Sequence, residues 1–163
     1  ICGNQPKLMI FEKVSELIKT FPKGSRLLGL DVGKKNIGIA ISDLGLKIAS
    51  PNSNLKRTKL KKDIESLEQI ILDKNIGGLI CGLPIKLDGS EGKACQSTRQ
   101  FAKDVNAELS IGISFWDERL STVAVERVLI QEADLSRQRR AQIVDKVAAV
   151  YILQSALDYL SSN

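Results

Sequence analysis

The segment from Arg26 to Asp43 constrains the possible fold of this chain most strongly. It reads as two apolar strands, at about 26–31 and 36–42, which are joined by a short glycine-flanked turn. One carboxylate, Asp31, stands at the end of the first strand. Burying an ionised carboxylate among apolar residues is costly unless a positive group pairs with it. The hairpin therefore predicts that a cationic partner lies near Asp31.

Small residues share a face of this hairpin with Asp31. Strand alternation places Gly29 beside Asp31 on one face of the first strand. The same alternation groups Gly38, Ala40 and Ser42 on one face of the second strand. Small residues let a ligand or a second backbone come close. Two interpretations fit this pattern equally well: room for a ligand, or tight packing of a helix on the sheet.

The remaining segments indicate a mixed α/β fold. Apolar spacing predicts helices over about 7–21, 92–109, 121–132 and 137–160, a further helix around Leu60–Ile71, and short strands near 46–49, 77–83 and 111–117. A hairpin that leads into alternating strands and helices favours a mixed sheet with helices on both faces. The 163 residues suit one main domain, which we place at 26–163, preceded by an N-terminal helical extension at 1–25.

Histidine is missing from the sequence, and cysteine occurs only three times. The lack of histidine removes the usual Ser–His–Asp and Cys–His nucleophile systems and the commonest zinc ligand. A bound metal would therefore be held by oxygen atoms, which favours Mg²⁺, Mn²⁺ or Ca²⁺. Cys81 and Cys95 are expected to be small buried hydrophobes, and with Cys2 they form no disulfide framework. This usage fits a reducing, cytoplasmic setting, and we see no signal-peptide pattern or membrane-spanning apolar run.

Positive charge is concentrated in the first part of the chain. The net charge is +5, but residues 1–60 hold 11 Lys or Arg against 4 Asp or Glu, and residues 61–163 hold 13 against 15. A basic surface favours a polyanionic partner, for which nucleic acid is the default candidate. Charge alone is weak evidence, because many basic proteins bind no nucleic acid.

Three further acids stand at positions that need a partner from elsewhere in the fold. Asp145 lies on a helical face among alanines, with no cation at the neighbouring helical spacings, so a tertiary salt bridge or a metal would have to balance it. Asp117 and Glu118 follow a strand, and alternation sends them to opposite faces. At most one of these two faces a shared site, and a helix-start pair is an equally good interpretation.

Taken together with Asp31, these acids favour a metal site. Converging carboxylates repel one another unless a cation lies between them, and Mg²⁺ suits a cage of carboxylates and water. Two such ions can activate a water molecule and stabilise the leaving oxygen in phosphodiester cleavage, a mechanism that needs no histidine. A basic surface would position the phosphate backbone without reading its sequence.

Four sequence blocks are similar to those of one known family. They run, in the family's order, from Gly29 to Asp43, from Gly82 to Gly92, from Asp117 to Thr122 with Leu135–Arg137, and from Val144 to Ser155. They make the chain resemble the pre-16S ribosomal RNA nuclease family, also called YqgF or RuvX, a Holliday-junction-resolvase-like group of the RNase H-like superfamily. One block alone is a weak signal, whereas four in order are a strong one.

The resemblance implies an RNase H-like fold, with a five-stranded mixed sheet between helices. It also implies a nuclease that depends on Mg²⁺ or Mn²⁺ and matures the precursor of 16S rRNA, so structured RNA is the expected partner, favoured over DNA junctions. By position, Asp31 and Asp145 match the family's catalytic, metal-binding acids. The Asp117–Glu118 pair supplies the third acid, and we favour Glu118.

Basic residues within these blocks are candidate contacts to the nucleic-acid backbone, although solvated surface charge explains each of them equally well. They are Lys34, Lys35, Arg119, Arg137, Arg139 and Arg140. Asn36 stands where many family members have arginine, which weakens the case for a phosphate contact there. Ser90, in a glycine-flanked turn, is expected to cap a helix rather than to act as a nucleophile.

Other functions fit parts of the same pattern. A DNA junction resolvase would use the same fold and acids on another substrate. A non-catalytic nucleic-acid-binding module would keep the basic surface, although the retained acids argue against it. The Asp-x-Gly turn between strands also occurs in actin-like ATP-binding proteins, but these need two related domains, which 163 residues cannot supply.

Overall fold

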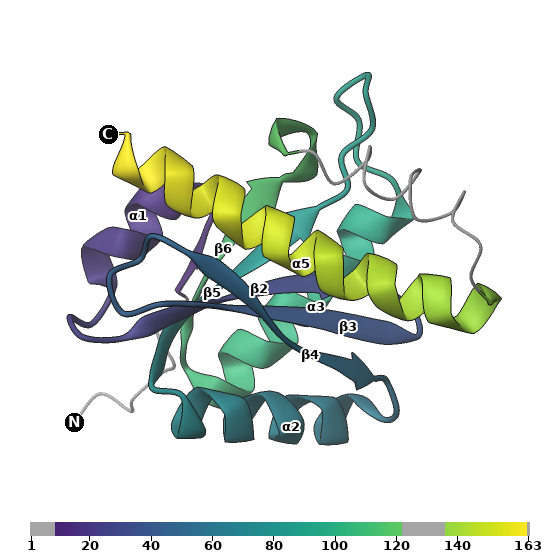
Figure 1. Ribbon diagram of the computed structural model, residues 1–163, viewed down its shortest axis with the longest axis horizontal. Coiled ribbons are helices and arrows are strands. Elements are labelled where there is room, and N and C mark those ends of the chain that lie inside the picture. The colour runs from purple at the N-terminus through teal and green to yellow at the C-terminus, as the bar shows by residue number, and fades with distance from the viewer. Residues whose placement is uncertain (1–8, 122–135, 163) are drawn as a thin grey trace, which may run out of the picture.

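The computed structural model describes residues 9–121 and 136–162, which form one mixed sheet between two layers of helices (Figure 1). The strands are β1 (Ile10–Phe11), β2 (Arg26–Val32), β3 (Asn36–Ser42), β4 (Ala49–Lys56), β5 (Ile76–Leu83) and β6 (Gly112–Asp117). The helices are α1 (Val14–Thr20), α2 (Leu60–Asp73), α3 (Lys93–Leu109), the short 3-10 helix η1 (Glu118–Leu120) and α5 (Arg137–Ser161). The sheet order is β1-β6-β5-β2-β3-β4.

Strand direction brings several strand ends to one edge of the sheet. The hairpin β2–β3 and the pair β3–β4 are antiparallel, whereas β5 pairs in parallel with both β2 and β6. The carboxyl ends of β2, β5 and β6 therefore lie side by side. This arrangement places Asp31, at the end of β2, at the same edge as the residues that follow β5 and β6.

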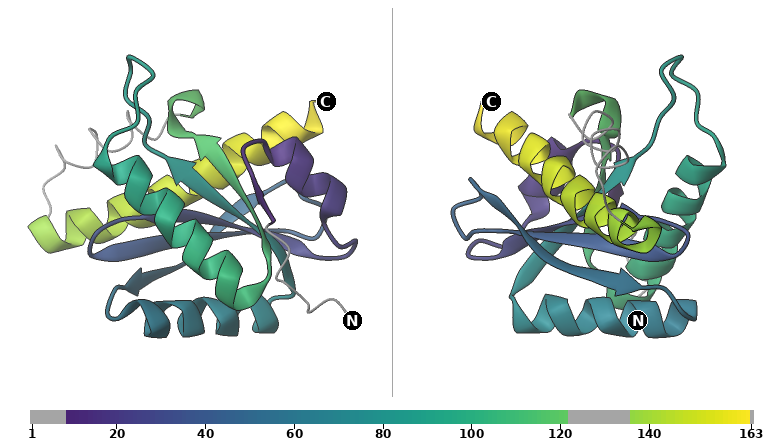
Figure 2. Two further views of the ribbon diagram at one scale, coloured as in Figure 1. Left: turned by 180° about the vertical axis from the view of Figure 1, so that it is seen from behind. Right: turned by 45° about the vertical axis from the view of Figure 1, so that its right-hand side comes forward.

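Each face of the sheet has its own apolar core. Leu28, Leu30 and Cys81 pack on the side of α2 and α3, whereas Leu27 and Ile80 pack on the side of α1 and α5. Figure 2 shows α5 crossing one face while α2 and α3 cover the other. Helices thus cover both faces of β2, which explains why its side chains are mostly apolar on both faces.

Gly29 is the point of closest approach between β2 and α5. A Cβ atom at this position would lie 2.7 Å from the Cβ of Leu153 and 3.0 Å from the carbonyl oxygen of Ala149. Of the two interpretations of the small-residue face, tight helix packing is therefore confirmed at Gly29. The helix that packs there also carries Asp145, one turn before Ala149.

The predicted α/β fold class is confirmed, but two local predictions were wrong. The third strand is β4 at Ala49–Lys56 rather than 46–49, because it is a polar edge strand that contains Pro51 and carries little apolar signal. The N-terminal helix, expected over 7–21, covers only Val14–Thr20. Ile10 and Phe11, which lie within the expected helix, instead form β1, which pairs with β6 and raises the strand count from five to six.

The other predicted boundaries within the described residues agree closely with the structure. The strands expected at 77–83 and 111–117 and the helices expected at 92–109 and 137–160 correspond to β5, β6, α3 and α5. Cys81 and Cys95 are free thiols in the core, as expected. The helix predicted over 121–132 lies outside the described residues. In the part of the chain that is described, no helix is long and apolar enough to cross a membrane.

Candidate active site

Two of the predicted acids lie at the same edge and on the same face of the sheet. Asp31 ends the apolar run of β2 and is 7% exposed, and Glu118 follows β6 and is 6% exposed. A Cβ atom at Gly82 would meet both Oε1 of Glu118 and Ile152 of α5, so the Glu118 carboxylate lies on the α5 side of the sheet. Asp31 shares its face with Gly29, which α5 covers. Both carboxylates therefore lie on the α5 side, at the ends of the two strands that flank β5.

Gly82, on the intervening strand β5, lets helix α5 and the Glu118 carboxylate pack closely against the sheet. A Cβ atom at Gly82 would lie 2.4 Å from Cδ1 of Ile152 and 3.0 Å from Oε1 of Glu118. Helix α5, strand β5 and the Glu118 carboxylate thus meet at this one position. Sequence reasoning placed Gly82 in a family block without giving it a role. The available signal was a glycine near the end of a buried apolar strand, which often marks a close approach of another group.

Asp117 has a different role from its neighbour. Its carboxylate accepts hydrogen bonds from the backbone N–H of Arg119 at 2.9 Å and from the guanidinium of the same residue at 2.8 and 3.1 Å. The side-chain hydrogen bonds from Arg119 hold the pKa of the Asp117 carboxyl below its usual value. Asp117 therefore caps η1, as the helix-start interpretation predicts, and Glu118 is the acid beside Gly82.

The third predicted acid, Asp145, is only partly placed. Its backbone belongs to α5, but its side chain lies outside the described part of the structure. Among the described residues, no group of three or more histidines, cysteines or acids gathers as a metal site would require. The three-acid site, with Asp145 as the third ligand, therefore stays a prediction.

The candidate basic contacts divide into two groups by position. Lys34 and Lys35 are exposed in the β2–β3 turn, directly after the strand of Asp31, and Arg119 lies on η1. Arg137 and Arg139 are exposed in the first turn of α5, which the Ser136 hydroxyl caps; Arg140 is half-buried there. The first group therefore lies at the edge that holds Asp31 and Glu118.

Arg57 fixes the turn that carries Lys34 and Lys35. Its guanidinium donates a hydrogen bond of 2.9 Å to the carbonyl oxygen of Gly33, and its backbone N–H donates one of 2.8 Å to the carbonyl oxygen of Lys35. Its Nε lies 3.5 Å from a carboxylate oxygen of Asp63, which is buried. This role of Arg57 has no local sequence pattern, because Gly33 lies 24 residues away in the chain.

The family model described as "RuvX: Holliday junction resolvase" matches residues 25–159 of this chain, which covers every predicted site residue. The chain belongs to the RuvX family.

Relatives within the RuvX family are close and cover almost the whole chain. A protein of Roseobacter denitrificans named "Putative pre-16S rRNA nuclease" is 51% identical over 154 residues, which is 92% of this chain and 93% of the relative. A protein of the same name from Paramagnetospirillum magneticum is 49% identical over 144 residues, covering 88% of this chain and 92% of the relative. The expected family is thus confirmed.

Solved structures confirm the fold of this RuvX family member. Thermus thermophilus RuvC in complex with a Holliday junction substrate aligns with a TM-score of 0.53 at 7% identity, covering 85% of this chain and 97% of that chain. The yeast mitochondrial Holliday junction resolvase Ydc2 aligns with a TM-score of 0.50 at 10% identity, covering 87% of this chain and 82% of that chain. At these identities the likeness shows a shared fold and nothing about substrate.

The described side chains suit a hard divalent cation at the sheet edge that holds Asp31 and Glu118, which we call the acid edge. Carboxylate oxygens are the ligands that Mg²⁺ and Mn²⁺ prefer, and Asp31 and Glu118 supply them from buried positions. Glu118 follows the C-terminal end of β6 and Asp31 lies near the C-terminal end of β2, on the two strands that flank β5. Two buried carboxylates on one face of the sheet are a donor set that suits such an ion.

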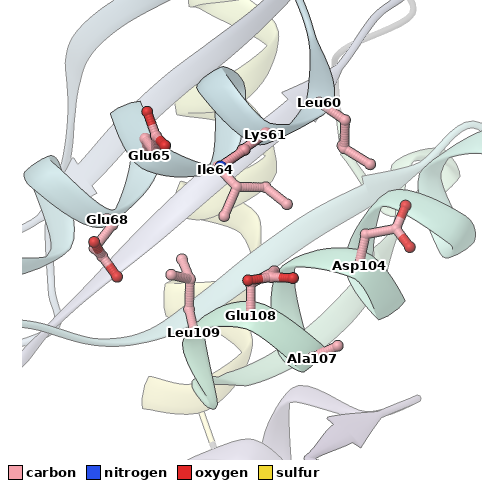
Figure 3. Close-up of a pocket in the computed structure, with 9 residues that line it drawn as sticks. All are labelled: Leu60, Lys61, Ile64, Glu65, Glu68, Asp104, Ala107, Glu108 and Leu109. Atoms are coloured by element: carbon pink, nitrogen blue, oxygen red, sulfur yellow. The ribbon is translucent and has the colours of Figure 1, made fainter.

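The cavity between α2 and α3 lies on the opposite face of the sheet and is a poor site for nucleic acid. It has a volume of about 380 Å³, and Figure 3 shows its lining residues. Four of them are acids, Glu65, Glu68, Asp104 and Glu108, against the single lysine Lys61. Carboxylates in this number repel a phosphate backbone. The acid edge therefore remains the better candidate for a nucleic-acid site.

Proposed function

We propose that this chain is a divalent-metal-dependent endonuclease that hydrolyses phosphodiester bonds in the precursor of 16S rRNA. The observation that carries the proposal is the placement of Asp31 and Glu118, two buried acids, on one face at the ends of the strands that flank β5. Membership of the RuvX family and the names of the close relatives support it. A cytoplasmic location goes with this function.

The proposed mechanism gives each group at the edge a separate task. Mg²⁺ or Mn²⁺, held by Asp31, Glu118 and Asp145, would supply the activation of a water molecule and the stabilisation of the leaving oxygen. Lys34 and Lys35 attract the phosphate backbone to the edge that holds Asp31. Arg119, oriented by Asp117, presents a guanidinium near the same edge. Arg137, Arg139 and Arg140 extend this basic surface along the start of α5.

We favour RNA as the substrate because the close relatives bear the name of an rRNA nuclease. The second candidate is cleavage of four-way DNA junctions, which the printed description of the family favours. The acids and the basic turn serve either polymer, because phosphate contacts carry no sequence information. A direct comparison of substrates must therefore separate the two.

The decisive experiment compares Asp31→Asn with the matched control Asp73→Asn, which alters an exposed acid at the end of α2. Each variant is incubated with Mg²⁺ or Mn²⁺ and either a 16S rRNA precursor fragment or a four-way DNA junction. We expect the wild type and Asp73→Asn to cut the RNA. Asp31→Asn should cut at least about 100-fold more slowly, because a lost metal ligand costs several kcal/mol of transition-state stabilisation, while still binding the RNA.

Three outcomes would contradict the proposal. An Asp31→Asn variant that cuts at the wild-type rate would remove the assigned role of Asp31. A wild-type protein that cuts only the DNA junction would favour the second candidate. Tight RNA binding without cleavage in either metal would indicate a non-catalytic binding module.

A further inference from the structure

Leu87 is unusually exposed for a leucine and lies beside the candidate active site. It is 94% exposed, the largest value among the exposed large hydrophobic residues of the described chain. It belongs to the segment between β5 and α3, which projects from the sheet where β5 ends (Figures 1 and 2). This is the edge at which Asp31 and Glu118 lie.

Hydrogen bonds hold Leu87 at the corner of a defined turn. The N–H of Gly89 donates to the carbonyl oxygen of Lys86 at 2.8 Å, and the N–H of Lys86 donates to the carbonyl oxygen of Ser90 at 3.0 Å. Gly89 has a φ of +87°, which favours glycine at this corner. The Ser90 hydroxyl donates to the Asp88 carboxylate at 2.6 Å, so Ser90 stabilises this turn. The prediction that Ser90 caps a helix was wrong, because the residue that precedes α3 is Gly92.

The turn is also tied to η1. The guanidinium of Arg119 donates to the carbonyl oxygen of Lys86 at 3.4 Å. The next residue of η1, Leu120, is 65% exposed and is a second outward-facing apolar side chain at this edge. Leu87 and Leu120 are thus two exposed apolar side chains on two segments that the Arg119 hydrogen bond connects, at the edge that holds the acids.

The surroundings favour a nucleobase over a protein partner as the occupant of this surface. Two leucines provide far less apolar area than the roughly 800 Å² per partner of a stable protein interface. Lys86 is exposed beside Leu87, the charge of Arg119 is balanced by Asp117, and RNA is recognised largely through unstacked bases in loops and ends. Leucine is among the side chains that insert between bases and unstack them.

We propose that Leu87, supported by Leu120, contacts an unstacked base of the RNA strand next to the cleaved phosphodiester bond. This inference rests on the proposed nuclease function and adds a substrate preference to it. The site selects RNA whose cleavage position lies in, or borders, an unpaired segment. Leu87 is a binding and specificity residue, and it takes no part in the chemistry of the acids.

The test uses RNA fragments that carry the fluorescent base 2-aminopurine next to the cleavage position. Binding is measured with full-length Asp31→Asn protein, with and without the additional change Leu87→Ser. We expect the fluorescence increase that reports unstacking to disappear with Leu87→Ser, and the affinity for RNA to fall about tenfold. Leu72→Ser is the matched control, because Leu72 is 71% exposed on α2. It should change neither signal.

Cleavage by proteins that keep Asp31 completes the test. Leu87→Ser should lower kcat/KM for RNA with an unpaired cleavage position and leave a fully paired RNA unaffected, whereas Leu87→Met should behave as wild type. Suppose that the wild type binds and cuts RNA, but that Leu87→Ser keeps both the fluorescence increase and the affinity. That result would overturn this inference alone. A wild type that does not bind RNA would overturn the proposed function as well. A dimer that dissociates with Leu87→Ser would assign Leu87 to a protein interface instead.

Discussion

Gly82 determines how closely helix α5 and the Glu118 carboxylate can approach strand β5. The sequence predicted an acid edge from Asp31 and from alternation after β6, because both signals are local. It could not predict which helix residue would pack on β5, since Ile152 lies far along the chain. A position whose importance depends on a distant side chain gives no local pattern.

We expect Gly82→Ala to impair both stability and the acid edge. The added methyl group would overlap Ile152 and press on Glu118. Overpacking of this kind costs about 1–3 kcal/mol, which urea unfolding would measure. Gly45→Ala, in the β3–β4 turn, is the control, because its nearest non-neighbouring atom would be 3.4 Å away. Equal unfolding free energies for the two variants would contradict this account of Gly82.

We expect the Cys81 thiol to lower the free energy of unfolding at alkaline pH. Burial raises the pKa of this thiol from 9.0 to about 12. The folded state keeps the proton while the unfolded state releases it above about pH 9, so stability from this group is lost as pH rises from 9 towards 12.

Urea unfolding at several pH values would check the effect of Cys81. Between pH 9 and 10, the wild type should lose about 1 kcal/mol more unfolding free energy than Cys81→Ala does. The comparison cancels the titration of lysines and tyrosines, which both proteins share. Parallel pH profiles would show that Cys81 makes no such contribution.

At the scale of secondary-structure elements, Arg57 connects the β2–β3 turn to the start of α2. It bonds to Gly33 on one side, and on the other it meets Asp63, which also accepts a hydrogen bond of 3.0 Å from the N–H of Thr58. The guanidinium lies 5.3 Å from the ring centre of Phe101 on α3. One side chain thus holds the turn that carries Lys34 and Lys35 against two helices.

We expect Arg57→Ala to destabilise the fold by about 2 kcal/mol, because it leaves the buried Asp63 carboxylate without its cation. It should also raise KM for RNA more than it lowers kcat, since it releases the lysine turn rather than the acids. Arg57→Lys keeps the charge but not the planar fork, so it should recover only part of both effects. The exposed neighbour Lys56→Ala is the control. An unchanged KM would show that the turn does not depend on Arg57.

The elements differ in how well the sequence predicted them, for physical reasons. The helices α2 and α3 and the strands β2, β3 and β5 have strong apolar periodicity, because they are packed on a core. Strand β4 is polar and lies at an edge, and β1 has two residues, so neither carries a hydrophobic pattern of its own. Both β1 and β4 form by pairing with a neighbouring strand, and the spacing of residues in the sequence does not show this pairing.

At the scale of the whole molecule, the charges predict how RNA binding depends on salt. Lys34 and Lys35 lie at the acid edge, whereas Lys23 and Lys74 lie where β2 and β5 begin, at the opposite edge. Net charge alone could not make this distinction, because it carries no position.

We expect Lys34→Ala/Lys35→Ala to reduce the slope of log K against log salt by about 1.5, which corresponds to two phosphate contacts on RNA. Lys23→Ala/Lys74→Ala removes the same charge and should leave the slope nearly unchanged. Fluorescence anisotropy over a salt series measures both. Equal slopes for the two double variants would mean that diffuse charge, rather than the turn, binds the RNA.

The pairing of β1 with β6 has a consequence for self-association. An open strand edge invites pairing with another molecule, and natural proteins cover or interrupt such edges. Pro51 interrupts the edge at β4, and the two residues of β1 cover β6, followed by Glu12, whose ion pair with Arg99 anchors them. The RuvX match begins at residue 25, so this protective strand lies outside it. Cutting the chain at the family boundary would expose the edge of β6 and leave it open to pairing with a strand of another molecule.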